Sequence, residues 1–196
     1  MKVNKDGQYE GVVKGRTVHL ARVTSVIGAF FENWDAVPME NLEKAARFGT
    51  KVHNATEYDD LGTLIMSKLD PLLWPCLKAW RKFKIDFKVE IEEVEPVIYN
   101  VRYGFAGRLD RIGLVNGIRS IIDIKTCKYK AISHDLQVAA YQGAWNELNP
   151  RKKALRRHLV ELRRDSTYRV TEIKGAGDYA VFLSAVALYN WRVKNS

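Results

Sequence analysis

The dipeptide Asn116-Gly117 constrains the fold of this 196-residue chain more than any other feature. Asn-Gly between two segments rich in β-branched residues favours a two-residue hairpin turn of type I′. One such segment runs from Gly104 to Val115, and the other from Ile118 to Thr126. The turn would pair Val115 with Ile118 and so fix the register of both strands.

Counting back along this hairpin predicts that Asp110 faces Asp123. Their Cβ atoms would lie about 4.5–5.5 Å apart on one face of the sheet. Strand alternation places Lys125 on the same face as Asp123. Two facing carboxylates repel each other and destabilise a sheet unless a divalent cation lies between them, so the register predicts a metal site. The metal would lower the pKa of a bound water and offset charge on a phosphate, while the lysine would position the nucleophile or stabilise developing charge.

Composition indicates an ordinary globular protein with a polyanionic partner. The hydrophobic fraction is 46%, and the net charge of +9 favours nucleic acid. No apolar run approaches the roughly 18 residues that cross a bilayer, and the first residues lead into no signal peptide. Cys76 and Cys127 cannot hold an iron–sulfur cluster that needs four cysteines, and they favour a reducing cytoplasm, that of the host if the gene belongs to a phage.

The remaining pattern predicts one mixed α/β domain over residues 1–196, with a central mixed β-sheet flanked by helices. Its core would cover about residues 41–175, with an N-terminal hairpin extension at 1–35 and a C-terminal helix at 177–194. Ser133 is the expected N-cap of a helix that ends at Leu148, before Asn149-Pro150. The other expected elements are hairpin strands at 8–14 and 17–22, helices at 24–33, after Pro38 and at 72–84, a strand at 88–101, and a late hairpin of 155–163 and 168–173.

Several short motifs resemble the PD-(D/E)XK nuclease superfamily, in its RecB-like and phage-type exonuclease branch. The GxxD strand is matched by Gly107 to Asp110, and the DxKT strand by Asp123 to Thr126. A QxxxY helix is matched by Gln137 to Tyr141, and a GxxxH helix by Gly49 to His53. The order and spacing of these motifs imply a restriction-endonuclease-like core.

The resemblance also implies roles for individual residues. Asp110, Asp123, His53 and the backbone carbonyl of Ile124 would hold one or two Mg²⁺ or Mn²⁺ ions. Lys125 would be the catalytic lysine, and Glu95 would orient the attacking water. Gln137 and Tyr141 share one helix face, which would look toward the active site and the DNA.

Basic residues are expected to bind the DNA backbone with little sequence preference. The candidates are Arg108, Arg151, Lys152, Lys153, Arg156 and Arg157. Trp80 and Phe83 could stack on bases, but their helical spacing favours a place in the core. The expected function is a metal-dependent DNA exonuclease acting on single- or double-stranded ends in phage or bacterial recombination or repair. It could form an oligomer or work with a recombination partner. The alternatives are a structure-selective endonuclease on the same fold and a non-catalytic nucleic-acid-binding accessory protein, and RNA stays open as a substrate.

Overall fold

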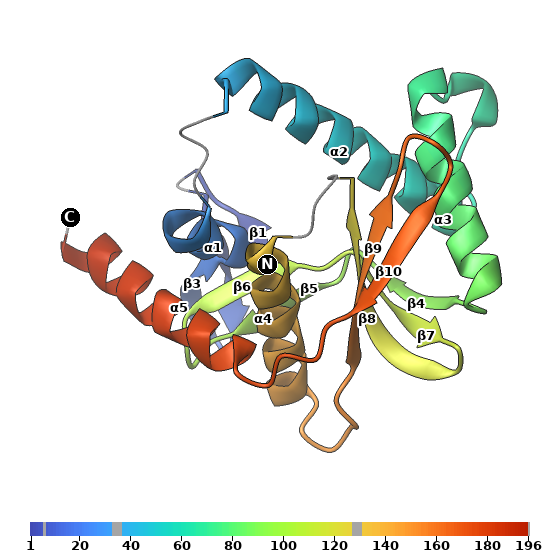
Figure 1. Cartoon of the computed structure of the whole chain (residues 1–196). Helices are drawn as coiled ribbons and strands as arrows, with labels where there is room; N and C mark the ends of the chain where they lie inside the picture. Colours follow the sequence, from blue (N-terminus) through green and yellow to red (C-terminus); the bar gives the residue numbers. More distant parts are fainter. Residues whose placement is uncertain (6, 33–36, 127–130, 196) are drawn as a thin grey trace.

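Two five-stranded sheets and five α-helices make up the part of the chain that the structure describes (Figure 1). The computed structural model describes residues 1–5, 7–32, 37–126 and 131–195. The expected mixed α/β fold class is confirmed, with helices on both sides of the strands. The strands are β1 (Lys2–Val3), β2 (Tyr9–Val13), β3 (Arg16–Arg22), β4 (Glu90–Val94), β5 (Val97–Asn100), β6 (Phe105–Arg108), β7 (Arg111–Val115), β8 (Ile118–Lys125), β9 (Arg156–Leu162) and β10 (Tyr168–Glu172). The helices are α1 (Val23–Phe31), α2 (Met39–Asp60), α3 (Trp74–Asp86), α4 (Ile132–Leu148) and α5 (Asp178–Asn195), with short 3-10 turns at Met66–Lys68 and Pro71–Leu73.

The first sheet has the order β10-β9-β8-β7-β4 and contains the hairpin predicted from Asn116-Gly117. Val115 pairs with Ile118, and both turn residues have positive φ angles of 49° and 76°, as a type I′ turn requires. The ladder continues back to the pair Arg111 and Ile122. The predicted register is therefore confirmed. The next residue before β7 is Asp110, and the next residue after Ile122 on β8 is Asp123.

The second sheet has the order β1-β2-β3-β6-β5. The chain passes between the sheets three times, the first through the helices between β3 and β4 and the other two directly, from β4 to β5 and from β6 to β7. Uninterrupted strands over 88–101 and 104–115 were expected, and this detail is wrong. The first segment breaks at Glu95, which has a φ of 53°, and the second breaks between β6 and β7. Backbone hydrogen bonds from Glu95 N to Asp110 O (2.9 Å) and from Leu109 N to Pro96 O (3.1 Å) carry the pairing through this bend.

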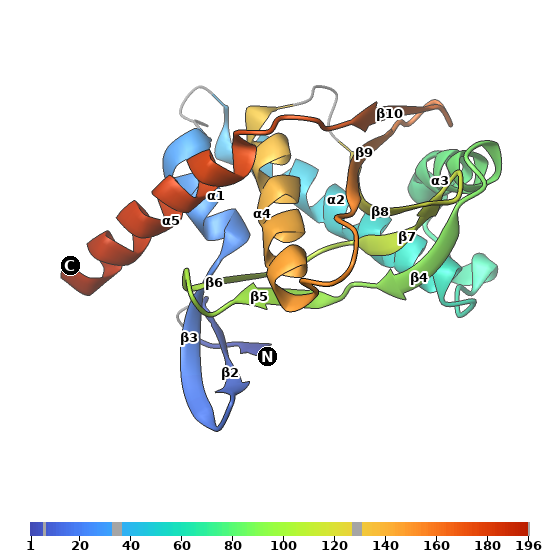
Figure 2. The same ribbon diagram turned by 90° about the horizontal axis from the view of Figure 1, so that it is seen from below.

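The helices bury two main apolar clusters. Helices α1, α4 and α5 pack together over the second sheet and one face of β8 and β9, while α2 and α3 cover the opposite face of these strands (Figures 1 and 2). Alternation along β8 explains this division, because Ile121 belongs to the first cluster and Ile122 and Ile124 to the second. Trp80 and Phe83 are fully buried in the second cluster, so the core interpretation of these aromatics is confirmed.

Two local expectations need adjustment. Helix α4 begins two residues earlier than Ser133 predicts: its N-cap is Ala131, whose backbone amide donates to His134 Nδ1, and Ser133 is buried in the first turn. Strand β1 had no counterpart in the sequence interpretation. Cys127 and the last residue of the helix expected at 24–33 lie outside the described residues, and no helix in the described ranges could span a membrane.

Candidate metal centre and active site

The bend between the two sheets brings together three groups that could ligate a metal. His53 comes from the buried side of α2, while Glu95 and Asp110 sit at the two direct connections between the sheets. One ligand atom of each lies within 4.8 Å of the others. Glu95 was expected to orient a water rather than to ligate, so the structure places it closer to the metal position than the sequence suggested.

Asp110 is the electrostatic centre of this group. One carboxylate oxygen lies 3.3 Å from His53 Nδ1, and the other accepts the backbone N–H of Ile124 at 2.6 Å. Burial alone would raise the pKa of Asp110, but the His53 charge and these hydrogen bonds outweigh it and lower the pKa. The Asp110 charge in turn raises the pKa of His53. The pair therefore keeps a carboxylate ionised in a buried position, as a cation ligand requires.

Asp123 and Lys125 lie on the same face of β8, as predicted. Lys125 Nζ is 2.8 Å from Asp123 Oδ2, while Asp123 Oδ1 is buried and accepts no hydrogen bond from the part of the chain that the structure describes. Burial raises the pKa of Asp123, and the neighbouring Asp110 charge adds to this rise. A buried carboxylate oxygen without a donor, beside a second carboxylate, is costly unless a cation or water completes it. The residues present therefore fit a divalent cation.

The backbone of Ile124 also faces this position. In a regular strand the N–H and C=O of one residue point to the same side. Since the Ile124 amide donates to Asp110, its carbonyl is directed toward the same edge of β8. This geometry supports the Ile124 carbonyl as a further oxygen ligand, and oxygen-rich sets of this kind suit hard cations.

A hydrogen-bonded chain of side chains holds Lys125 in position. Lys125 Nζ donates to Gln137 Oε1 at 2.9 Å, and Gln137 Nε2 donates to the Tyr141 hydroxyl at 3.0 Å. Burial raises the pKa of Tyr141 above its ordinary value, so the hydroxyl stays protonated. Gln137 and Tyr141, one turn apart on α4, thus act on Lys125 through the amide rather than facing solvent.

Gly107 leaves the space that Tyr141 fills. A Cβ atom at this glycine would lie 2.5 Å from Tyr141 Cε1 and 3.2 Å from Val23 Cγ2. We expect Gly107→Ala to lower the free energy of unfolding by about 1–3 kcal/mol, because overpacking forces Tyr141 to move. Urea denaturation would measure it.

Gly28 in α1 provides a matched control. The nearest atom to a Cβ there is the distant Glu32 carboxylate at 3.7 Å, so Gly28→Ala should keep or slightly raise stability, since alanine favours helix. Equal unfolding midpoints for wild type and Gly107→Ala would show that Tyr141 is not held as described.

Two arginines form ion pairs with the two carboxylate oxygens of Glu95. The Nε of the exposed Arg108 lies 2.7 Å from Glu95 Oε2, and the Nη1 of the fully buried Arg111 lies 3.3 Å from Glu95 Oε1. Arg111 also donates to the Asp110 carbonyl oxygen (2.7 Å) and pairs with buried Asp60 (2.7 Å). Sequence reasoning missed Arg111, although a charged residue in an otherwise apolar strand directly after Asp110 was a signal for it.

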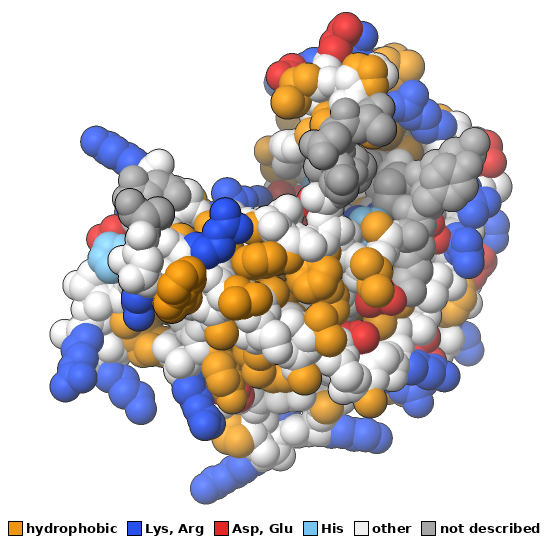
Figure 3. Space-filling view, turned by 60° about the vertical axis from the view of Figure 1, so that its left-hand side comes forward, with side chains coloured by type: hydrophobic (Ala, Val, Ile, Leu, Met, Phe, Trp, Pro, Cys, Tyr) orange, Lys and Arg blue, Asp and Glu red, His pale blue; other side chains and the backbone are white. Residues whose placement is uncertain are grey.

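The structure separates the expected DNA-binding residues. Arg108 lies at the site. The other exposed candidates follow the C-terminal end of α4 and lead into β9: Arg151, Lys152, Lys153 and Arg156. Arg156 is in register with Ser120, at the opposite end of β8 from Lys125, so this group lies away from the site. The expectation that Arg157 binds DNA is wrong. Arg157 is buried, and its guanidinium binds Asp178 (3.2 Å) and the Gly175 carbonyl (2.9 Å), so it cannot reach a phosphate. On the face that Figure 3 shows, Lys and Arg side chains surround an apolar area and do not gather in one patch.

Comparisons with known proteins place the chain in a family. A family model described as the PD-(D/E)XK nuclease superfamily matches residues 66–187. A solved structure from Eubacterium rectale, provisionally described as an exonuclease, superimposes with a TM-score of 0.57 at 13% identity and covers 89% of this chain and 79% of that chain. A second solved structure, SSO0001, has a TM-score of 0.43 at 21% identity and covers 89% of this chain and 76% of that chain. A search of curated proteins found no match.

Proposed function

Because this chain belongs to the PD-(D/E)XK nuclease superfamily, a family of nucleic-acid hydrolases that use divalent metals, we propose that it is a DNA exonuclease that requires Mg²⁺ or Mn²⁺. The observation that carries the proposal is the convergence of Asp110, Asp123 and Lys125 with His53 and Glu95 at one bend. We further propose that the whole chain works as one nuclease domain. The resemblance to RecB-like and phage exonucleases supports a role in recombination or repair.

The side chains of the site have separable tasks. Asp110, Asp123, His53 and the Ile124 carbonyl would hold the cation, and Glu95 is close enough to add a ligand atom. A divalent cation there would activate water and offset the negative charge that develops on the phosphate. Lys125, held by Gln137, would donate to a phosphate oxygen and help align the attacking water. Arg108 would bind the nucleic-acid backbone when it leaves Glu95, and the remote block Arg151, Lys152, Lys153 and Arg156 would reach only distant nucleotides.

Metal binding should stabilise the protein measurably. A ligand present at 100 times its Kd adds about 2.7 kcal/mol to the free energy of unfolding. We expect Mg²⁺ or Mn²⁺ to raise the Tm of the wild type above its value in EDTA, and Asp110→Asn or His53→Ala to lose most of this rise. Thermal unfolding without nucleic acid would show it. An unchanged metal-dependent rise in both variants would exclude these residues as ligands.

The activity itself is tested with end-labelled linear DNA, single- and double-stranded, beside closed circular DNA. Each substrate is incubated with Mg²⁺, Mn²⁺ or EDTA, for the wild type and for Lys125→Ala. Degradation of linear DNA from an end, only with metal and only by the wild type, would support the exonuclease, and the label gives its polarity. Cleavage of circles would identify an endonuclease instead. Retention of DNA at low salt without cleavage would indicate a binding module, and parallel RNA substrates would define the sugar preference.

A further inference from the structure

A row of charged residues crosses the first sheet from the catalytic lysine to its edge. Lys125 on β8 is in register with Glu161 on β9, and Glu161 is in register with Arg169 on β10. Registered residues in neighbouring strands point to the same face of a sheet. Alternation places this row on the α4 side, because Leu159 packs in the cluster of α4 while Val160 and Leu162 pack against α3.

Glu161 at the centre of the row is a buried carboxylate. It is 4% exposed, and its Oε2 accepts no hydrogen bond from the described residues. The Nε of Arg169 lies 3.6 Å from that oxygen, which is an ion pair too long for a hydrogen bond. The Glu161 carboxylate therefore attracts the Arg169 guanidinium electrostatically, while the hydrogen-bond donors of the guanidinium stay unused by Glu161.

The Arg169 guanidinium differs from those of three other arginines in its hydrogen bonding. Arg81, Arg111 and Arg157 all donate hydrogen bonds to carboxylates or carbonyls. The Arg169 side chain donates no hydrogen bond within the described ranges, and it is 60% exposed. A guanidinium offers a planar set of donors that matches a phosphate, so this one is available to an anionic ligand.

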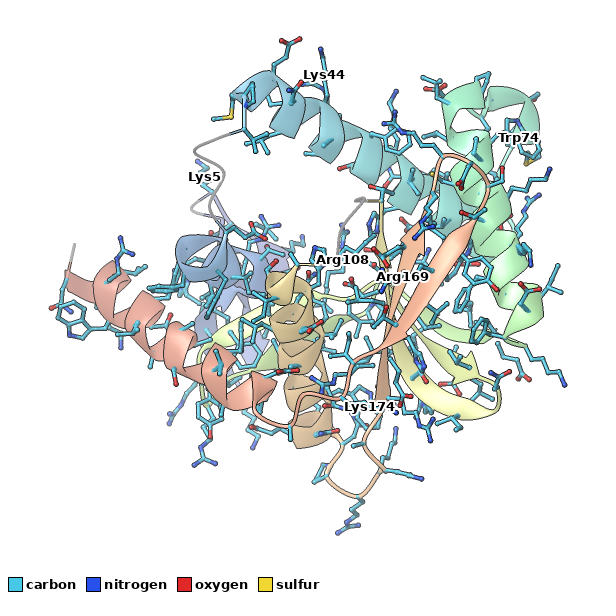
Figure 4. The ribbon with its side chains drawn as sticks, viewed as in Figure 1. Lys5, Lys44, Trp74, Arg108, Arg169 and Lys174 are labelled. Carbon is cyan, nitrogen blue, oxygen red and sulfur yellow. The ribbon has the colours of Figure 1, made fainter. Side chains whose placement is uncertain are left out.

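We infer that Arg169 binds a backbone phosphate of the substrate strand a few nucleotides from the scissile phosphate, with Glu161 holding it on the same face of the sheet as Lys125. This inference rests on the proposed function. Strands are spaced about 4.8 Å apart, so Lys125 and Arg169 are separated by about 10 Å at their Cα atoms. That distance corresponds to about three base-pair steps of 3.4 Å along the axis of a duplex. Arg108 comes from β6 and pairs with Glu95, whereas Arg169 comes from β10, on the other side of β8 from β7 (Figure 4).

Steady-state cleavage of linear DNA by Arg169→Ala tests this assignment, beside Lys174→Ala as the matched control. Lys174 follows the same hairpin, is 77% exposed and pairs with Glu172, at the end of β10 away from Lys125 (Figure 4). Both changes remove one positive charge. We expect Arg169→Ala to raise KM about 10-fold with kcat within about 2-fold, and to reduce the slope of log affinity against log salt by about 1. Arg169→Lys should recover part of the affinity.

The two variants separate the inference from the proposed function. If the wild type degrades DNA and Arg169→Ala matches Lys174→Ala in KM and in salt dependence, Arg169 is not a phosphate ligand although the nuclease assignment stands. If Arg169→Ala lowers kcat and leaves KM unchanged, its role is structural and the inference is overturned. If the wild type binds DNA without cutting it, the proposed function fails, and equilibrium binding of the same variants still decides the role of Arg169.

Discussion

The Lys125→Ala variant is expected to lose at least about 1000-fold in kcat/KM on linear DNA, with a Kd for DNA close to that of the wild type. The reason is that Lys125 is the cation beside both carboxylates, held by Asp123 and Gln137 at 2.8 and 2.9 Å. Removing a positioned donor that stabilises developing charge costs about 100- to 1000-fold, and losing the alignment of the nucleophile adds to this. Single-turnover cleavage with Mg²⁺ measures the rate, and fluorescence anisotropy in Ca²⁺ or EDTA measures binding.

Two comparisons keep this expectation testable. Lys174→Ala removes a lysine charge far from the site and should cleave at the wild-type rate. Gln137→Leu should lower the rate less than Lys125→Ala does, because it removes the amide that holds the ammonium and leaves the ammonium itself. Wild-type cleavage by Lys125→Ala would exclude it from the chemistry, whereas a matching loss of DNA affinity would reassign it as a binding residue.

The part of the site that the sequence predicts is the part fixed by local geometry. A two-residue turn sets the register of β7 and β8, and strand alternation then brings Asp123 and Lys125 onto one face, next to Asp110. These rules act over a few residues. The helix spacing of Gln137 and Tyr141 is equally local, although only the structure shows that they hold Lys125 by hydrogen bonds.

The remaining features depend on contacts between distant segments. The positive φ of Glu95, which ends one sheet and begins the next, is unusual for a glutamate and no local pattern indicates it. In the sequence Arg157 belongs to a run of basic residues. Its partner Asp178 lies at the start of α5, so only the folded chain shows that Arg157 is paired. Arg169 lies in the same row as Lys125 only because β8 and β9 pair in parallel, and these two strands are separated in the sequence by the whole of α4.

The bend that carries Glu95 and Asp110 is held by a buried ionic network around Arg111. Its guanidinium is fully buried and pairs with Asp60, at the end of α2, and with Glu95. It also donates to the Asp110 carbonyl and to Thr56 Oγ1. Lys84 and the Trp80 indole N–H complete the coordination of Asp60 at 2.6 and 3.0 Å. The network therefore joins α2, which carries His53, to the two connections that carry Glu95 and Asp110, so buried contacts position these candidate ligand groups.

Replacing Arg111 with methionine is expected to lower the free energy of unfolding by about 3–5 kcal/mol, because it leaves Asp60 buried with one cation fewer. Urea denaturation in EDTA measures this loss without a contribution from bound metal. Arg119→Met is the matched control: Arg119 pairs with Glu92 at 2.6 Å but is 34% exposed, so its loss should stay below about 1 kcal/mol. The double variant Asp60→Asn/Arg111→Met should lose less than the sum of its two single variants, since the residues act as a pair. Equal destabilisation by Arg111→Met and Arg119→Met would mean that the bend is maintained by backbone pairing alone, and the metal ligands would then keep their positions without Arg111.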